Sequence, residues 1–213
     1  MSRQMQKIVV LLFALALVIP MGAVGLANVF GQGEEPDAPP VTQEEDPRPE
    51  VDPEDQPTPT ATEVPERPGA MDEQSAAGAE ATLEHVLASY PYMMATGDVE
   101  PWTASMAEDC EVCVQFVANA QLLHEQGGYL VGGEFDVRET TFEGEGDPPT
   151  SGAVTADFLE AEAQLVDDPT REAHQLDAVE GVLEAQMVWD TDRERWVIQD
   201  MQMQLPEQPD GDG

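Results

Sequence analysis

SYPYMMATGDVEPWTASMAEDCEVCVQFVANAQLLHEQGGYLVGG, residues 89–133, holds most of the signals that decide the fold of this chain. Within it, Thr96-Gly97-Asp98 predicts a corner between two helices, because glycine suits the end of one helix and aspartate the start of the next. The spacing that follows indicates a short helix over residues 99–106 and a longer one over residues 109–126. We therefore expect the stretch to form the corner of a scaffold.

Four glycines carry the chain from the last of these helices into a sheet. The first two are expected to end the helix, and all four mark the passage into the strand that follows. They are Gly127, Gly128, Gly132 and Gly133.

Residues 76–96, upstream of the corner, have helical periodicity. Their apolar positions share one face, which we expect to be buried: Leu83, Val86, Leu87, Tyr90 and Met94. Pro91 lacks a backbone donor, so it is expected to kink or divide this helix.

Downstream segments alternate apolar and polar residues as strands do. They cover residues 129–142, 153–166, 173–189 and 196–205. The second changes phase near Phe158 and Leu159, which indicates a bulge, and residues 190–195 form a hairpin turn. Helices followed by a long antiparallel sheet predict an α+β domain over residues 76–205, with N-terminal helices packed on a curved sheet.

The N-terminal segment predicts export. Residues 1–7 are a basic region that keeps the N-terminus in the cytoplasm, and residues 8–30 are apolar and long enough to span a membrane as an anchor. In the alternative, cleavage after Ala27 releases a secreted chain. In both cases the rest of the chain is expected outside the cytoplasm, and the membrane is the expected partner of residues 8–30.

Residues 31–75 are rich in proline and acidic residues and contain no aromatic residue. Low hydrophobicity with high charge predicts disorder, and proline with self-repulsion predicts an extended stalk. A passive spacer is expected, since no sharp motif marks the segment as a proline-rich ligand. The acidic tail, residues 206–213, is likewise expected to be disordered.

The charge of the chain is strongly negative, with a formal net charge of −36. Residues 76–205 alone hold 27 acidic against 4 basic side chains. Such a field repels phosphate backbones, so nucleic acid is excluded as an expected partner. A solvated surface is the simplest explanation of the charge.

Cys110 and Cys113 form a Cys-x-x-Cys pair at the start of a helix. Outside the cytoplasm such a pair persists as a disulfide, so we expect a bridge that fixes the corner between two helices. A thiol-disulfide redox site is the alternative, but Glu108, Asp109 and Glu111 oppose the lowered thiol pKa that it needs.

No metal or cofactor site is expected. Zinc needs further cysteine or histidine ligands, and His85, His124 and His174 are scattered along the sequence. The acidic segments 143–147 and 190–192 lack the pattern of a calcium loop and are expected to be exposed turns.

Several motifs occur here in a fixed order: a tyrosine-rich first helix, Thr96-Gly97-Asp98, Cys110-x-x-Cys113, the glycines of 127–133 and Trp196. Together they resemble a family of actinobacterial envelope proteins and lipoproteins of unknown function. The resemblance implies a cone fold of the nuclear-transport-factor-2-like type, shared with ketosteroid-isomerase-like and SnoaL-like proteins, and homodimerisation through the sheet. Many members carry a lipid-attached cysteine after the signal; this chain has none there, so lipidation is not expected.

Isomerases of this fold place a carboxylate base and a tyrosine donor in the cavity of the cone. The candidates for such a cavity are Asp98, Asp136, Tyr90, Tyr92 and Trp102. Nothing in their spacing selects a pair. Asp136 alternates with Phe135 and Val137, which points it to solvent, and Tyr90 lies on the apolar face of the first helix.

The sequence therefore predicts an uncharacterised exported cell-envelope protein on a membrane tether, acting as a non-enzymatic module that binds a small ligand or another envelope protein. A cavity enzyme of the ketosteroid-isomerase or SnoaL type is the first alternative. An extracytoplasmic thiol-disulfide protein is the second.

Overall fold

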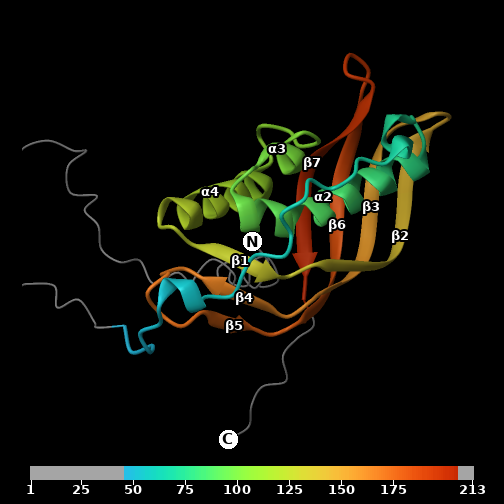
Figure 1. Ribbon diagram of the computed structural model, residues 1–213. Coiled ribbons are helices and arrows are strands. Elements are labelled where there is room, and N and C mark those ends of the chain that lie inside the picture. The colour runs from blue at the N-terminus through green and yellow to red at the C-terminus, as the bar shows by residue number, and fades with distance from the viewer. Residues whose placement is uncertain (1–45, 206–213) are drawn as a thin grey trace, which may run out of the picture. The chain divides into compact units, whose positions relative to one another are not determined.

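The computed structural model describes residues 46–205 of the chain, and residues 50–205 lie in one unit, described below. The 3-10 turns are η1 (Pro53–Asp55) and η2 (Gly69–Asp72), and the helices are α2 (Ala76–Thr96), α3 (Glu100–Thr103) and α4 (Glu111–Glu125). The strands are β1 (Tyr129–Gly132), β2 (Phe135–Gly146), β3 (Pro149–Glu160), β4 (Ala163–Val166), β5 (His174–Leu176), β6 (Val179–Asp190) and β7 (Arg195–Gln204). The class is α+β, as predicted (Figure 1).

The strands form two antiparallel sheets instead of the single sheet that was expected. The larger sheet has the order β2-β3-β6-β7 and the smaller one the order β1-β4-β5. The chain passes between them three times, from β1 to β2, from β3 to β4 and from β5 to β6. The predicted strands 129–142, 153–166 and 173–189 are each interrupted at one of these passages.

Two glycines explain the first interruption. Gly132 and Gly133 have φ angles of 82° and 77°, which residues with a Cβ rarely adopt. A Cβ on Gly132 would also lie 2.6 Å from the backbone oxygen of Glu162 on the facing segment. The chain leaves β3 at Glu160 and restarts as β4, so the predicted strand 153–166 is two strands. The irregularity predicted near Phe158 is present in the pairing, but the extra residue lies on β2, between Val137 and Glu139.

Helix α2 is buried on almost every side. Fourteen of its 21 residues are buried, including polar ones such as Thr82 and Ser89, whose hydroxyls donate to the backbone oxygens of Gly78 (2.8 Å) and His85 (2.7 Å). The helix runs through Pro91 without a break, so the expected division at this residue is wrong. Packing on both sides of the helix offsets the hydrogen bond that proline removes.

One face of α2 packs on the sheets and on α4, where the core lies. Leu83, Val86 and Met93 are fully buried there, together with Val154 of β3 and Ile198 of β7. The predicted apolar face of the first helix is thus confirmed. Figure 1 shows α2 lying across the strands of the larger sheet.

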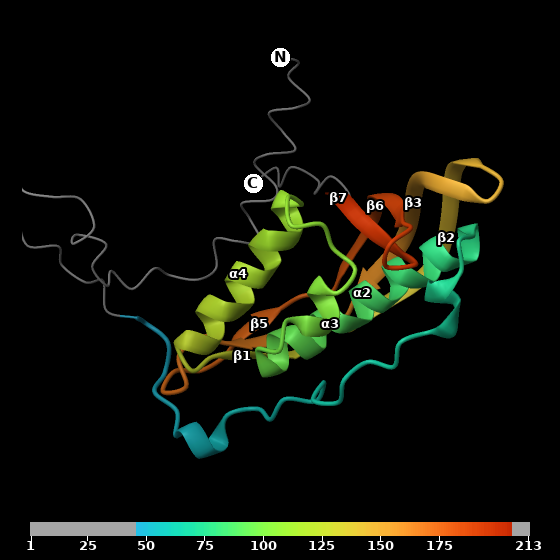
Figure 2. The ribbon, with the colours of Figure 1, turned by 90° about the horizontal axis from the view of Figure 1, so that it is seen from above.

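The opposite face of α2 is covered by residues 50–75, which we call the strap. Figure 2 shows the strap running beside α2 from η1 to η2. At its start, the Gln56 side chain donates to the backbone oxygens of Pro169 (3.0 Å) and Arg171 (2.6 Å). At its end, the backbone oxygen of Glu73 accepts from the Trp196 indole (3.1 Å), and Met71 is 2% exposed.

The strap replaces part of the stalk expected over residues 31–75. Composition predicts disorder for this segment because it has little to bury, but composition does not register the contacts that the segment makes with α2 and with the distant strand β7. The compact unit therefore begins at Glu50, ahead of the predicted domain start at Ala76. The predicted segments 1–7, 8–30 and 206–213, and the stalk as far as residue 45, lie outside the described residues; within residues 46–205, no helix is long and apolar enough to cross a membrane.

A strap and a disordered stalk make opposite predictions for Met71. Met71→Ala should lower the free energy of unfolding by about 2–4 kcal/mol, because truncating a buried methionine removes apolar contacts and leaves a cavity. The measurement is urea unfolding followed by tryptophan fluorescence. Val64→Ala, at a residue 63% exposed, is the matched control and should change the free energy of unfolding by less than about 0.5 kcal/mol. Equal effects of the two variants would show that Met71 is not buried against the domain.

Candidate functional site

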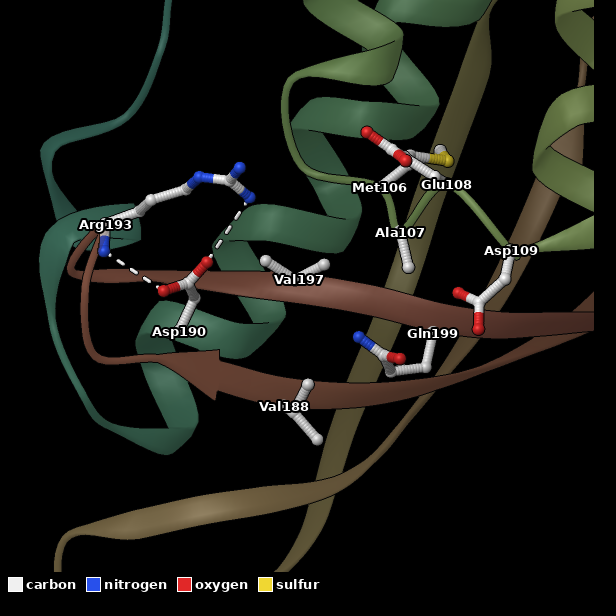
Figure 3. Close-up of a pocket in the computed structure, with 9 residues that line it drawn as sticks. All are labelled: Met106, Ala107, Glu108, Asp109, Val188, Asp190, Arg193, Val197 and Gln199. Atoms are coloured by element: carbon white, nitrogen blue, oxygen red, sulfur yellow. Dashed lines mark hydrogen bonds and ion pairs between the residues drawn. The ribbon is translucent and has the colours of Figure 1, made fainter.

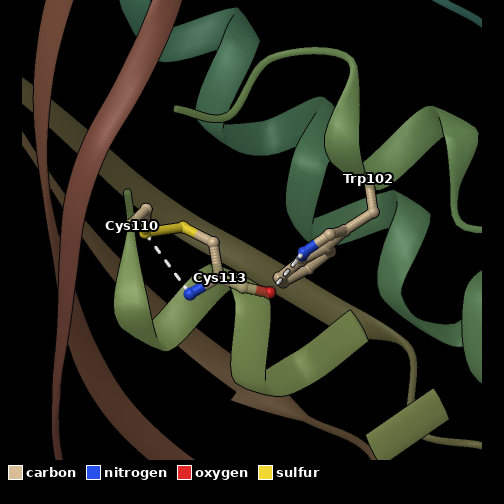
Figure 4. Close-up of a disulfide and its surroundings, with 3 residues drawn as sticks. All are labelled: Trp102, Cys110 and Cys113. Atoms are coloured by element: carbon tan, nitrogen blue, oxygen red, sulfur yellow. Dashed lines mark hydrogen bonds between the residues drawn. A yellow bond between two sulfur atoms is a disulfide. The ribbon is translucent and has the colours of Figure 1, made fainter. Parts of the chain in front are cut away.

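The two cysteines form the predicted disulfide at the start of α4. Their Cα atoms are 5.3 Å apart, and the Cys110 sulfur accepts the backbone N–H of Cys113 at 3.3 Å as the cap of the helix. The Trp102 indole donates to the backbone oxygen of Cys113 at 3.4 Å (Figure 4). The bridge therefore closes the first turn of α4, and the Trp102 hydrogen bond joins this turn to α3 at the corner that the sequence predicted.

The burial of both cysteines argues against a redox role for this disulfide. Cys110 is 1% exposed and Cys113 is 2% exposed. Thiol-disulfide exchange requires direct attack of a thiolate on one sulfur, so it requires access that neither sulfur has in the folded chain. The geometry favours a structural role.

The predicted corner at Thr96-Gly97-Asp98 is also structural. Gly97 has a φ of 77° and its N–H donates to the Met93 oxygen at 2.9 Å, which ends α2. One oxygen of Asp98 accepts from the Tyr92 hydroxyl at 2.9 Å and the other from the Glu100 N–H at 3.1 Å. Both carboxylate oxygens of Asp98, a candidate base in the sequence, thus stabilise the corner. The hydrogen bond to Asp98 raises the pKa of the Tyr92 hydroxyl.

The interior between the helices and the sheets is filled by aromatic rings. The Tyr90 ring lies 6.1 Å from Trp102, 5.7 Å from Phe116 and 5.6 Å from Phe135, measured between ring centroids. Phe135 in turn lies 5.3 Å from Phe158. The structure thus brings Tyr90 and Trp102 together as core residues, while Tyr92 turns away to Asp98.

The side chain of Glu160 reaches this interior, and the sequence did not indicate it. It pairs with Phe135 across the strands and follows Phe158 by two residues, so all three side chains share the inner face of the sheet. Burial raises the pKa of the Glu160 carboxyl to about 7. Burial first, and then the nearby Glu160 charge, raise the pKa of the Tyr90 hydroxyl well above its usual range.

The other nominated residues lie apart from this pair. Asp136 is exposed, as its alternation with Phe135 predicted. The His124 ring contacts the Met94 oxygen at 3.1 Å, whereas His174 lies 3.3 Å from Asp167. Within residues 46–205, no three His, Cys, Asp or Glu side chains are grouped so as to hold a metal ion.

A surface groove lies between the segment before the disulfide and the β6–β7 hairpin. We call it the hairpin groove; its volume is about 570 Å³. Its lining residues are Met106, Ala107, Glu108, Asp109, Val188, Asp190, Arg193, Val197 and Gln199 (Figure 3). Asp190 at one end accepts the backbone N–H groups of Asp192 and Arg193, and it pairs with the Arg193 guanidinium at 3.4 Å.

Backbone pairing at the edge of the larger sheet shapes this groove. The N–H of Ile198 donates to the Ser105 oxygen, and the N–H of Ala107 donates to the Ile198 oxygen, both at 2.9 Å. The segment is thereby held against β7, and the disulfide fixes the chain three residues further on. The hairpin turn and the disulfide were both predicted from local sequence, but nothing in the sequence places them on opposite sides of one groove.

Comparison with known proteins gives a family without an assigned activity. The model of the "Family of unknown function (DUF6318)" matches residues 56–202. No curated protein matches the chain significantly.

Solved structures with a similar arrangement include the intermembrane space region of the chloroplast protein ARC6, with 14% identity, a TM-score of 0.48, and coverage of 62% of this chain and 98% of that one. A Novosphingobium aromaticivorans protein described provisionally as a scytalone dehydratase has 11% identity, a TM-score of 0.39, and coverage of 59% and 83%. An "Ntf2 like protein involved in plasmid conjugation" has 15% identity, a TM-score of 0.35, and coverage of 62% and 50%. At these scores, no activity or residue role is carried over.

The raised pKa of Glu160 predicts a stability that falls as the pH rises. Between its ordinary pKa of 4.5 and about 7 the folded chain binds the proton more strongly than the unfolded chain, so the free energy of unfolding decreases across this window. Glu160→Gln removes the cost of the buried charge, so it should raise the free energy of unfolding by at most about 3 kcal/mol at pH 8. The gain should shrink steadily as the pH falls to 5.

Urea unfolding of both chains at pH 5, 6, 7 and 8 measures this difference. Glu162→Gln, at an exposed residue on the same bend, is the control and should show the same offset at every pH. A constant offset for Glu160→Gln as well would show that Glu160 is not buried as described.

The buried disulfide predicts resistance to reduction in the folded chain. Glutathione followed by iodoacetamide should leave Cys110 and Cys113 unlabelled under native conditions and fully labelled in urea, as measured by mass spectrometry. Replacing both cysteines by alanine should lower the free energy of unfolding by about 2 kcal/mol, because the bridge restricts the unfolded chain. Complete labelling of the native chain within minutes would favour the thiol-disulfide alternative.

Proposed function

The chain belongs to the family of unknown function DUF6318, and we propose that this member is a non-enzymatic binding module that acts outside the cytoplasm on a membrane tether. The tether is the apolar segment 8–30 with the acidic segment that follows it. The folded part that does the binding is residues 50–205. Its partner is another protein of the cell envelope or a small ligand.

One observation carries the choice of a binding module: the filled interior. An enzyme of the cone type needs a cavity in which a base and a donor face the substrate. In this chain the rings of Tyr90, Trp102 and Phe116 pack against one another in that region, with centroids 5.3–6.1 Å apart. The hairpin groove, by contrast, is a surface feature lined partly by charged side chains, among them Glu108, Asp109 and Arg193.

Glu160 supports a second candidate, a cavity enzyme. A general base works best when its pKa is near the operating pH, and burial brings the carboxyl of Glu160 to about 7. Tyr90 beside it is the matching hydroxyl donor. These are different residues from Asp98 and Asp136, which the sequence offered for this role.

A turnover assay distinguishes the two candidates. The full chain, purified in a mild non-ionic detergent, is incubated with a panel of small ketones and enones at pH 6 to 8, and product is followed by mass spectrometry. We expect no rate above that of buffer. Turnover that Glu160→Gln and Tyr90→Phe both abolish, with the exposed-site variant Asp136→Asn unchanged, would replace the binding module by the enzyme.

The location of the chain is tested separately. In intact cells or spheroplasts, added protease should digest the folded domain. N-terminal sequencing of the exported protein should find residues 1–30 still attached. A mature N-terminus at Asn28 would replace the anchor by a cleaved signal. Protection of the domain until the cells are lysed would contradict export.

A further inference from the structure

The hairpin groove has an apolar floor and one end with unpaired negative charge. Ala107, Val188 and Val197 supply the apolar part of its lining (Figure 3), with Val197 itself 7% exposed. Glu108 and Asp109 at its rim are exposed, and within residues 46–205 neither carboxylate forms a hydrogen bond or ion pair. Two different chemistries are therefore available side by side.

At the other end of the groove the one carboxylate of the lining already has partners. Asp190 there is already neutralised, since it accepts two backbone N–H groups and pairs with Arg193. These interactions lower the pKa of the Asp190 carboxyl. A positive charge on a partner is consequently directed to the end with Glu108 and Asp109, next to the apolar floor.

From this arrangement, and resting on the proposed binding function, we propose that the hairpin groove docks a basic peptide segment in which a lysine or arginine neighbours an aliphatic side chain. The aliphatic side chain covers Val188 and Val197, and the cation faces Glu108 and Asp109. The Gln199 side-chain amide lies at the same end, where it can donate to or accept from the peptide backbone. Anionic lipid and phosphate are repelled by the same carboxylates.

Charge alone does not select this groove, because acidic residues occur on other surfaces too. A second hollow of about 640 Å³ is lined by Arg138, Glu139, Asp157, Phe158, Glu180, Gly181, Val182, Gln204 and Leu205. It lies about 20 Å away, since Val182 and Val188 are six residues apart on β6 and a strand rises about 3.3 Å per residue. In this second hollow the Arg138 guanidinium pairs with Glu180 at 3.0 Å, as Arg193 pairs with Asp190 in the hairpin groove. The second hollow therefore offers a control surface that matches the hairpin groove in size and in charge.

The test uses three fluorescent hexapeptides and the full chain in mild detergent. The first peptide alternates lysine with leucine, the second lysine with serine, and the third glutamate with leucine. Fluorescence anisotropy should show that the lysine-leucine peptide binds more tightly than either of the others. Its affinity should fall as salt is raised, because exposed charge pairs are screened.

Matched double variants locate the site. Glu108→Gln with Asp109→Asn should weaken binding of the lysine-leucine peptide about three- to tenfold, as expected for two exposed charge pairs. Glu139→Gln with Asp157→Asn removes the same charge from the second hollow and should change the affinity by less than about twofold. Circular dichroism of both variants should match that of the parent chain.

Equal weakening by the two double variants, equal binding of the lysine-serine peptide, or no binding of the lysine-leucine peptide would each overturn the proposal. None of these outcomes affects the proposed binding function, which fails only if the turnover assay detects catalysis that depends on Glu160 and Tyr90. Failure of the peptide site and failure of the function are thus distinguished.

Discussion

Helix α2 has no free face along most of its length, and this constraint organises the domain. A helix that packs on a sheet normally keeps one side in water, but α2 buries His85 and Ser89 on the side away from the sheets as well as Leu83 and Val86 facing them. The second side must be covered by another part of the chain. The strap supplies that cover, which explains why the match to the family begins at residue 56, well before the first residue of α2.

The sequence indicated local features well and tertiary ones less well. Gly97, the end of α4 beside Gly127, the hairpin after Asp190 and the disulfide were predicted because each depends on a few adjacent residues. The strap was missed because its cover over α2 depends on contacts with residues far away in the chain, such as Trp196. Glu160 was missed because residues 153–166 were predicted as one strand, although β3 ends at Glu160, with this residue on the inner face.

The interior of the domain is packed with aromatic rings, and its surface is charged. The first would have to hold the cavity of an enzyme, and the second offers the surface of a binding module. Aromatic packing around Tyr90 favours stability and leaves recognition to the surface. The outer face of the larger sheet carries exposed carboxylates at Glu139 and Asp157, joined by Glu180. Homodimerisation through the sheet stays a prediction, and two such faces would meet with these carboxylates opposed and with the Arg138–Glu180 ion pair beside them.

The attachment of the strap has a mechanical consequence. Val51 donates to the Thr170 oxygen at 3.0 Å, and Glu50 lies opposite Arg171, beside the end of the smaller sheet. If the chain is held by its N-terminus, a pulling force reaches the loop between β4 and β5 before it reaches α2. These contacts then bear the load one after another, first this loop and Gln56 and later the indole of Trp196. The first contacts to rupture under tension are therefore peripheral, while the helix and the core behind it remain folded.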